Sequence, residues 1–284
     1  MLADPVSKEP DFKFSAVEVK LYRKPVEKII VAGAGAAAHR FLCAYRSLNQ
    51  QDEILIISKE KNSFYNRVLL PGYVNETLGW DKLQKFKNGE VEALDVTLQP
   101  ENEITGINRE QKFVIDKYGR KHGYDKLILA TGSRAHMPKD APENLDGVFT
   151  MRTRQDADRL KKYVKPGGHI LIIGGGLLGL ELAVSMREIN VLISILQLGS
   201  RLMERQIDSI AGQLLLDFVD EKDITVYMND QLLHIIKDET SGKLSVQLRS
   251  GKIITTDAIV NAVGTRPNIE FAQEAGIESA RGSW

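Results

Sequence analysis

The residues best suited to chemistry are glycines in two short, regularly spaced groups. They follow the spacing GxGxxG or its variant GxGxxA, at Gly174, Gly176 and Gly179 and at Gly33, Gly35 and Ala38. In this motif the first glycine permits a tight turn, and the second lets a pyrophosphate approach the backbone. The third position lets a helix pack closely on a strand. Each group therefore predicts a cradle for the phosphates of a dinucleotide, although a glycine turn can also serve packing alone.

Each glycine group lies where a buried strand would turn into a helix. Ile170 to Ile173 is an apolar run typical of a buried parallel strand, and Lys28 to Ala32 is the matching run in the first group. Apolar residues at three- and four-residue intervals then predict a helix, at Phe41, Leu42, Tyr45 and Leu48. The start of such a helix presents free N–H groups and the positive end of its dipole to phosphates.

An acidic residue follows the first glycine group at the distance that a dinucleotide fold needs. Ile54 opens a strand, ILIIS, and Glu60 lies 22 residues after Ala38. An acid near this position accepts a hydrogen bond from a ribose hydroxyl. Glu60 is therefore a cofactor-binding candidate, and the alternative is a solvated charge in the loop KEKN.

A hairpin and a short buried strand complete the first half of the chain. Lys112 to Tyr118 and Lys121 to Tyr124 predict two antiparallel strands, and Leu127 to Ala130 predicts a strand that ends at Thr131 and Gly132. Small residues at the end of a strand let a ligand approach the backbone, although a plain tight turn has the same pattern.

The second half repeats this order. A hairpin is expected around Ser250 and Gly251, and the strand in DAIVNAVG ends at Gly264. The first and last glycines are 99 positions apart in the first half and 90 in the second. Two coincident copies of a weak motif are a stronger signal than one, and they predict two similar nucleotide-binding units.

These elements predict an α/β protein with two Rossmann-like, three-layer dinucleotide-binding units. We expect an extension over residues 1–26, a first unit over 27–150, a second unit over 151–268 and a tail over 269–284. The boundary between the two units lies in the proline-containing segment SRAHMPKDAPENLDG and a helix near Gln155 to Tyr163.

Composition excludes several classes of function. Lys plus Arg and Asp plus Glu number 38 each in 284 residues, so the charge predicts neither a nucleic acid nor an anionic membrane as partner. The single cysteine, Cys43, rules out an internal disulfide and a CxxC redox centre. The sequence has no GxSxG or HExxH motif, and its five histidines lack metal-ligand spacing, so no metal is expected.

The first 24 residues scatter charges and prolines where a signal peptide would have an apolar core. No run is long and apolar enough to cross a bilayer, and we therefore expect a cytoplasmic protein. The extension is either mobile or contributes an edge strand around Val17 to Leu21.

Six segments together carry a family resemblance: GAGAAA, YNRVLL, ILATGS, GGGLLGLE, LMERQID and AVGTRPN. In this combination the chain resembles the flavin-dependent pyridine-nucleotide reductases, and within them the flavin portion of the NAD(P)H nitrite reductase large subunit. The resemblance covers roughly Glu27 to Gly276.

The resemblance implies two cofactors, FAD at Gly33, Gly35 and Ala38 and NAD(P)H at Gly174, Gly176 and Gly179. Units 27–150 and 151–268 would then be the FAD-binding and NAD(P)-binding domains. Glu60 would bind the ribose of FAD, Thr131 and Gly132 would lie along FAD, and Gly264 would face a ligand. Arg67 would lie beside the flavin ring and Glu181 near the nicotinamide. The implied reaction is hydride transfer from nicotinamide to flavin, followed by transfer of electrons to an acceptor protein or domain.

Two departures from the family pattern stand out. Leu196, Gln197 and Leu198 occupy the place of the acid that binds the second ribose, and nearby Arg201 could accommodate a 2′-phosphate, so NADH and NADPH both stay open. Relatives also return to the FAD domain after the AVGTRPN segment, whereas this sequence stops at Trp284. We therefore expect a weakened flavin site, and a chain that is a fragment or one part of a split enzyme.

Alternatives remain at this stage. A ferredoxin or rubredoxin reductase or an NADH oxidase would share most of the motifs and differ mainly in its electron acceptor. A non-catalytic nucleotide-binding module is the rival from another class. A homo-oligomer also stays open.

Overall fold

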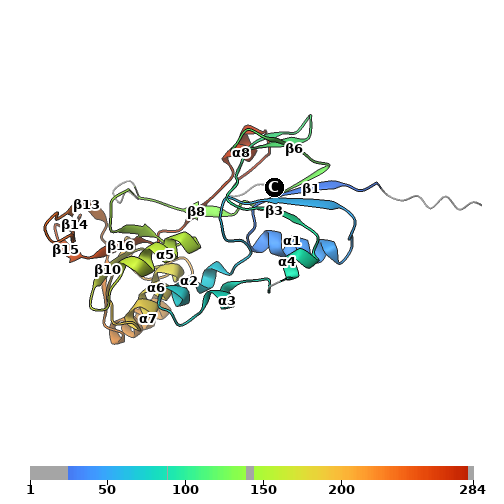
Figure 1. Cartoon of the computed structure of the whole chain (residues 1–284). Helices are drawn as coiled ribbons and strands as arrows, with labels where there is room; N and C mark the ends of the chain where they lie inside the picture. The colour runs from blue at the N-terminus through green and yellow to red at the C-terminus, as the bar shows by residue number, and fades with distance from the viewer. Residues whose placement is uncertain (1–24, 88, 139–143, 281–284) are drawn as a thin grey trace, which may run out of the picture.

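The computed structural model describes residues 25–87, 89–138 and 144–280. It has two parallel-sheet units, which lie beside each other and are joined through β8 (Figure 1). The edge strand considered around Val17 to Leu21 lies outside the described residues.

The first unit is built on a four-stranded parallel sheet with the order β3-β2-β1-β7. Its strands are β1 (Lys28–Ala32), β2 (Glu53–Ile57), β3 (Thr97–Gln99) and β7 (Lys126–Leu129). Alternate residues of β1 enter two different cores because successive side chains of a strand point to opposite faces. Ile29 and Val31 pack with α1 (Ala36–Arg46), while Ile30 packs with an antiparallel meander on the other face. That meander comprises β4 (Ile104–Asn108), β5 (Phe113–Asp116) and β6 (Lys121–Gly123).

The second unit repeats this plan on a five-stranded parallel sheet with the order β12-β11-β10-β16-β9. Its strands are β9 (Val148–Thr150), β10 (His169–Ile173), β11 (Leu192–Gln197), β12 (Ile224–Met228) and β16 (Ala258–Asn261). Ile170 and Ile172 pack toward the helices, whereas Leu171 and Ile173 pack toward a second meander. The helices are α5 (Arg154–Tyr163), α6 (Leu177–Arg187) and α7 (Ser209–Glu221), and the meander is β13 (Leu232–Lys237), β14 (Leu244–Leu248) and β15 (Ile253–Thr256).

The predicted fold class is confirmed, with three differences of detail. Each expected hairpin is part of a three-stranded meander, because β4 and β13 add a strand on one side. Strand β9 ends at Thr150, the last residue that we assigned to the first unit, yet it pairs with β16 of the second sheet. Helix α1 ends at Arg46, and Leu48 is 87% exposed, so the apolar stripe predicted for this helix does not extend to Leu48.

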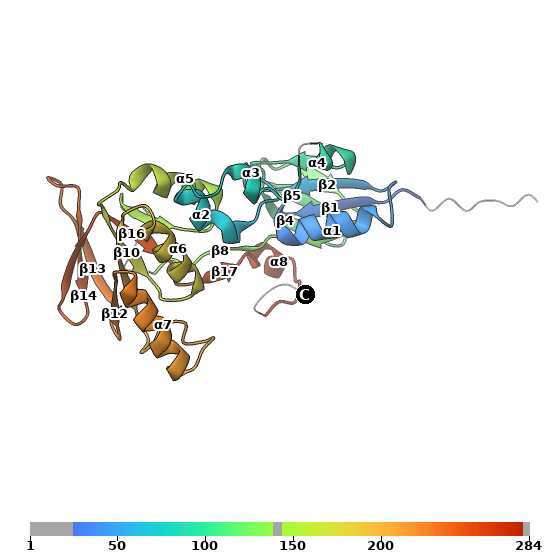
Figure 2. The same ribbon diagram turned by 90° about the horizontal axis from the view of Figure 1, so that it is seen from below.

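One segment crosses from the first unit into the core of the second. It contains the 3-10 turn η1 (Arg67–Leu69) and the helices α2 (Leu70–Val74) and α3 (Trp80–Leu83), and α2 packs against α5 and α6 (Figure 2). Leu70 and Leu83 are fully buried there with Leu160 of α5. The short helix α4 (Glu90–Ala93) follows, near α1.

A two-stranded antiparallel ribbon forms a second connection. It pairs β8 (Ser133–Ala135), which leaves the first unit, with β17 (Thr265–Pro267), which returns from the second. Helix α8 (Glu270–Glu274) follows β17 and packs on β4 of the first unit. Among the described residues, no helix is long and apolar enough to span a membrane.

Candidate functional site

The first glycine turn connects β1 to α1, and its two glycines have different roles. Gly33 has a φ of +103°, and a Cβ atom there would lie 2.3 Å from the carbonyl oxygen of Ala130. Only glycine fits, because both the backbone conformation and the space exclude a side chain. A Cβ at Gly35 would meet nothing within 4 Å. Gly35 is also the N-cap of α1, and no side chain of the described residues caps the helix, so its first N–H groups have no side-chain acceptor.

The second glycine turn connects β10 to α6 and has the same division of roles. Gly174 has a φ of +111°, and a Cβ there would lie 2.7 Å from the carbonyl oxygen of Ala262. A Cβ at Gly179 would lie 2.1 Å from the carbonyl oxygen of Gly174, so this residue keeps α6 close to the strand. At Gly176 a Cβ would again meet nothing within 4 Å in the part of the chain that the structure describes, and no side chain there caps α6. Ala38, which corresponds to Gly179 in the first unit, is fully buried.

In each unit, the second strand and the loop after it form two backbone hydrogen bonds with the glycine turn, at matching positions. The N–H of Gly33 donates to Ile57 O at 2.8 Å, and the N–H of Gly174 donates to Leu196 O at 2.8 Å. Seven residues after Ile57, the N–H of Phe64 donates to Ala34 O at 2.7 Å. Seven residues after Leu196, the N–H of Met203 donates to Gly175 O at 2.9 Å. The two units therefore share the spacing of the two backbone hydrogen bonds that hold the glycine turn.

Glu60 lies in the first of these loops and is brought together with Arg67. The Nη2 of Arg67 lies 2.5 Å from Oε1 of Glu60, and the hydroxyl of Tyr65 donates to Oε2 at 2.6 Å. Arg67 also donates to the carbonyl of Arg152 at 3.0 Å, and the N–H of Arg154 donates to the Tyr65 hydroxyl at 3.1 Å. This network links the loop after β2 to the start of α5, and thus one unit to the other.

Burial and these partners shift the titration of the network. Burial, together with the hydrogen bond to Glu60, raises the pKa of Tyr65 well above its usual value. Burial alone would lower the pKa of Arg67, but the hydrogen bond to Glu60 raises it instead. Tyr65 and Arg67 therefore keep their ordinary protonation states near neutral pH, and both donate hydrogen bonds to the Glu60 carboxylate.

Thr131 and Gly132 follow β7 and are tied to Asn268, which follows β17. The Thr131 hydroxyl donates to Asn268 O at 2.9 Å, and the Asn268 Nδ2 donates to Thr131 O at 2.9 Å. The N–H of Asn268 donates to Gly132 O at 3.0 Å. Gly132 and Gly264 both have positive φ, +64° and +100°, and each directly precedes one strand of the ribbon. These residues therefore shape the junction between the units.

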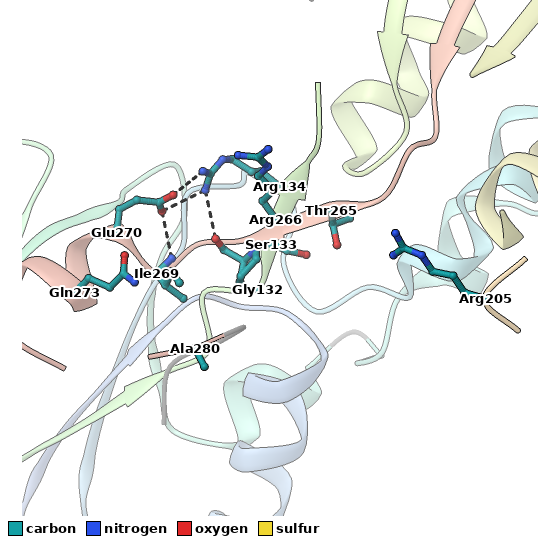
Figure 3. Close-up of a pocket in the computed structure, with 11 residues that line it drawn as sticks. Gly132, Ser133, Arg134, Arg205, Thr265, Arg266, Ile269, Glu270, Gln273 and Ala280 are labelled. Atoms are coloured by element: carbon teal, nitrogen blue, oxygen red, sulfur yellow. Dashed lines mark hydrogen bonds and ion pairs between the residues drawn. The ribbon is translucent and has the colours of Figure 1, made fainter. Parts of the chain in front are cut away.

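An open hollow of about 840 Å³ lies beside this ribbon (Figure 3). Gly132 lines it together with Arg134, Arg205 and Arg266. Arg134 forms an ion pair with Glu270 of α8 at 2.5 Å, whereas Arg205 reaches the hollow from the second unit (Figure 3). The hollow is thus bounded by both units, and its charged lining consists of these three arginines and Glu270.

The other candidate residues have varied surroundings. Glu181 lies in the second turn of α6, is half-buried and has no hydrogen-bonded or ionic partner among the described residues. The stem of Arg201 lies on Gly212 of α7, and its Nη2 donates to the carbonyl of Glu204 at 3.1 Å. The structure brings Arg67 to Glu60, and within the described ranges neither residue has a hydrogen bond or an ion pair with Glu181.

Gln197 has a role that sequence reasoning missed. It is buried at the end of β11, its Oε1 accepts from the N–H of Gly175 at 2.8 Å, and its Nε2 donates to Arg201 O at 3.1 Å. The side chain that stands at the usual place of a ribose-binding acid therefore secures the glycine turn to the following loop. Its position at the end of the strand was the available signal, because a carboxamide can both donate and accept hydrogen bonds.

Within the described ranges, no group of three or more His, Cys, Asp or Glu residues is arranged to hold a metal ion. The cradles at Gly35 and Gly176 instead fit diphosphate groups, because exposed N–H groups at a helix start attract anions.

Comparisons with known proteins agree with this geometry. Residues 27–284 match the model of the family described as pyridine nucleotide-disulphide oxidoreductase. The chain is 29% identical over 256 residues to a nitrite reductase [NAD(P)H] large subunit of Klebsiella oxytoca, covering 89% of this chain and 26% of that protein. It is 31% identical over 255 residues to an NADH-rubredoxin oxidoreductase of Clostridium acetobutylicum, covering 90% and 62% respectively.

Among solved structures, a covalent putidaredoxin reductase–putidaredoxin complex has a TM-score of 0.86 at 22% identity, covering 90% of this chain and 63% of that one. This likeness shows the fold. The chain therefore spans between about a quarter and under two thirds of the length of these relatives. The family resemblance drawn from the motifs is confirmed, and the chain belongs to the pyridine nucleotide-disulphide oxidoreductase family.

Proposed function

We propose that this chain is the two-cofactor module of an NAD(P)H-dependent flavoprotein oxidoreductase, with FAD at the first glycine turn and NAD(P)H at the second. The observation that carries the proposal is the repeated open cradle. Gly35 and Gly176 each leave empty space where a side chain would stand, at the uncapped start of a helix. Packing alone requires Gly33, Gly174 and Gly179, but it does not require these two.

The chain's residues would hold and orient the two cofactors. The N–H groups at the starts of α1 and α6 would donate to the two diphosphates. Glu60 would accept from the ribose of FAD, Thr131 and Gly132 would border FAD, and Gly264 would border the junction. Arg67 would place a positive charge near the flavin, and Glu181 would lie near the nicotinamide. With both cofactors bound, the nicotinamide supplies a hydride that the flavin accepts.

The acceptor that we favour is a nitrite-reducing domain, which the name of the Klebsiella relative suggests. Rubredoxin, a ferredoxin or oxygen are the alternatives, since relatives are named NADH-rubredoxin oxidoreductase, ferredoxin--NAD(+) reductase component and NADH oxidase. In each case the acceptor would be a separate protein, another domain or a small molecule.

A second candidate is a nucleotide-binding module without redox activity. The observation that favours it is the engagement of Glu60, whose carboxylate is already held by Tyr65 and Arg67. A ribose hydroxyl would have to share or displace these donors.

Direct titration tests the proposal. The purified chain is titrated by calorimetry with FAD and separately with NADH and NADPH. We expect one FAD site and one pyridine-nucleotide site. Gly35→Ala should lower only the affinity for FAD, and Gly176→Ala should lower only the affinity for the pyridine nucleotide. Binding of a pyridine nucleotide without FAD supports the module without redox activity, and binding of neither contradicts both candidates.

A further inference from the structure

The second nucleotide turn lacks an acid at the end of β11, but a carboxylate from farther along the loop lies against Gly199, just beyond the end of that strand. A Cβ atom built on Gly199 would lie 1.8 Å from Oε2 of Glu204. The Glu204 carboxylate therefore rests directly on the backbone of Gly199, two residues after the last residue of β11. Any side chain at position 199 would displace it.

The matching register of the two units shows what Gly199 corresponds to. Ile57 and Leu196 accept from the first glycine of each turn, and the bonds from Phe64 and Met203 follow seven residues later in each loop. Counting three residues from Ile57 reaches Glu60, and three from Leu196 reaches Gly199. The carboxylate of Glu204 thus lies where the side chain of the residue equivalent to Glu60 would begin.

The other polar groups near the turn are already used. The Gln197 carboxamide is occupied by Gly175 and Arg201, and the stem of Arg201 lies on Gly212. Glu204 is exposed, and among the described residues its carboxylate has no hydrogen-bonded or ionic partner. The adjacent Met203 N–H holds Gly175 O at 2.9 Å, which fixes the loop, and with it Glu204, beside the glycine turn.

We propose that Glu204 is the ribose-recognising acid of the second unit and that it makes the chain select NADH over NADPH. The inference rests on the proposed function, because it assumes that a pyridine nucleotide binds at this turn. A carboxylate accepts hydrogen bonds from a ribose 2′-hydroxyl, whereas it repels the 2′-phosphate of NADPH. Selection then comes from position 204 and the absence of a side chain at Gly199.

Two variants change the carboxylate in different ways. Glu204→Gln removes its charge, and Gly199→Ala keeps the charge but pushes the carboxylate aside. Gly199 does not have a positive φ, so alanine fits the backbone there. Glu221→Gln, at the opposite end of α7, is the control for loss of an exposed acid.

The experiment measures calorimetric affinities of the chain for NADH and NADPH, and for ADP-ribose with and without a 2′-phosphate. The unchanged chain should bind NADH at least about tenfold more tightly than NADPH. Glu204→Gln should lower the affinity for NADH about tenfold and raise the affinity for NADPH. Gly199→Ala should shift the ratio of the two affinities in the same direction. Glu221→Gln should change neither affinity.

Opposite changes for the two nucleotides separate recognition from simple damage to the loop, which would weaken both. An unchanged NADH to NADPH ratio in both variants overturns the role of Glu204 while leaving the proposed function intact. If the unchanged chain binds neither nucleotide, the proposed function fails, and this inference fails with it.

Discussion

Alanine at two neighbouring glycines of the second turn should separate packing from ligand binding. At Gly179 a Cβ would lie 2.1 Å from the carbonyl oxygen of Gly174, more than an ångström inside ordinary van der Waals contact at 3.4 Å. Helix α6 would have to move away from β10. Because the clash is with a backbone atom, the cost of overpacking lies in the upper part of the range of about 1–3 kcal/mol, and the better helix propensity of alanine offsets about 1 kcal/mol of it. We expect Gly179→Ala to lower the free energy of unfolding by about 1–2 kcal/mol.

At Gly176 the same change should leave stability almost intact. A Cβ there meets nothing within 4 Å, and replacing an N-cap glycine by alanine costs only about 0.5 kcal/mol. The added methyl group would instead stand in the space proposed for the diphosphate. We expect the affinity for NADH to fall at least about tenfold, which corresponds to about 1.4 kcal/mol.

The assay combines urea unfolding, followed by circular dichroism, with calorimetric titration of NADH. The reasoning is refuted if Gly176→Ala binds NADH as tightly as the unchanged chain, or if Gly179→Ala unfolds at the same urea concentration. Gly35→Ala is the matched variant in the first unit and should leave NADH binding unchanged, because its open space belongs to the other turn.

Three further predictions concern stability. Leu83→Ala should lower the free energy of unfolding by about 2–5 kcal/mol in urea titrations, because Leu83 is fully buried in the core of the second unit. The control Leu48→Ala, at an 87% exposed site, should change the free energy of unfolding by less than about 0.5 kcal/mol. Tyr65→Phe should cost about 1–2 kcal/mol in the same assay, since Glu60 loses a donor and the Arg154 N–H loses its acceptor; an unchanged midpoint would contradict the linking role of this network. Burial alone would raise the pKa of Asp116, but hydrogen bonds from Asn102, His122 and Arg120 hold this pKa well below its usual range. The Asp116 carboxylate therefore stabilises the fold above about pH 4, and this stabilisation is lost as the pH falls toward the lowered pKa. Unfolding measured from pH 7 down to pH 2 should show a stability loss that is smaller in Asp116→Asn, and equal slopes would count against this explanation.

The sequence predicted the parts of the fold that depend on local pattern. Both glycine turns, their strands and helices, and the repeat were visible because Gly33 and Gly174 need a particular backbone conformation at a fixed distance from an apolar run. The meander strands β4 and β13 were missed, since ITGIN and LLHIIK lack a clear alternation and turn signal.

The parts that could not be predicted depend on contacts between distant segments. Nothing local marks Leu70 and Leu83 as core residues of the second unit rather than the first. The same holds for Gln197 and Glu204, whose roles come from side chains that reach across a loop. The contact of Arg67 with Glu60 was also unexpected, because each residue had been considered separately as a neighbour of FAD.

Anaerobic addition of NADH to the chain saturated with FAD tests the central claim most directly. The account predicts that FAD gives a yellow protein and that NADH bleaches its visible absorbance, and that Gly176→Ala slows the bleaching. A protein that binds both FAD and NADH but keeps its visible absorbance would contradict the claim that this chain transfers electrons between them.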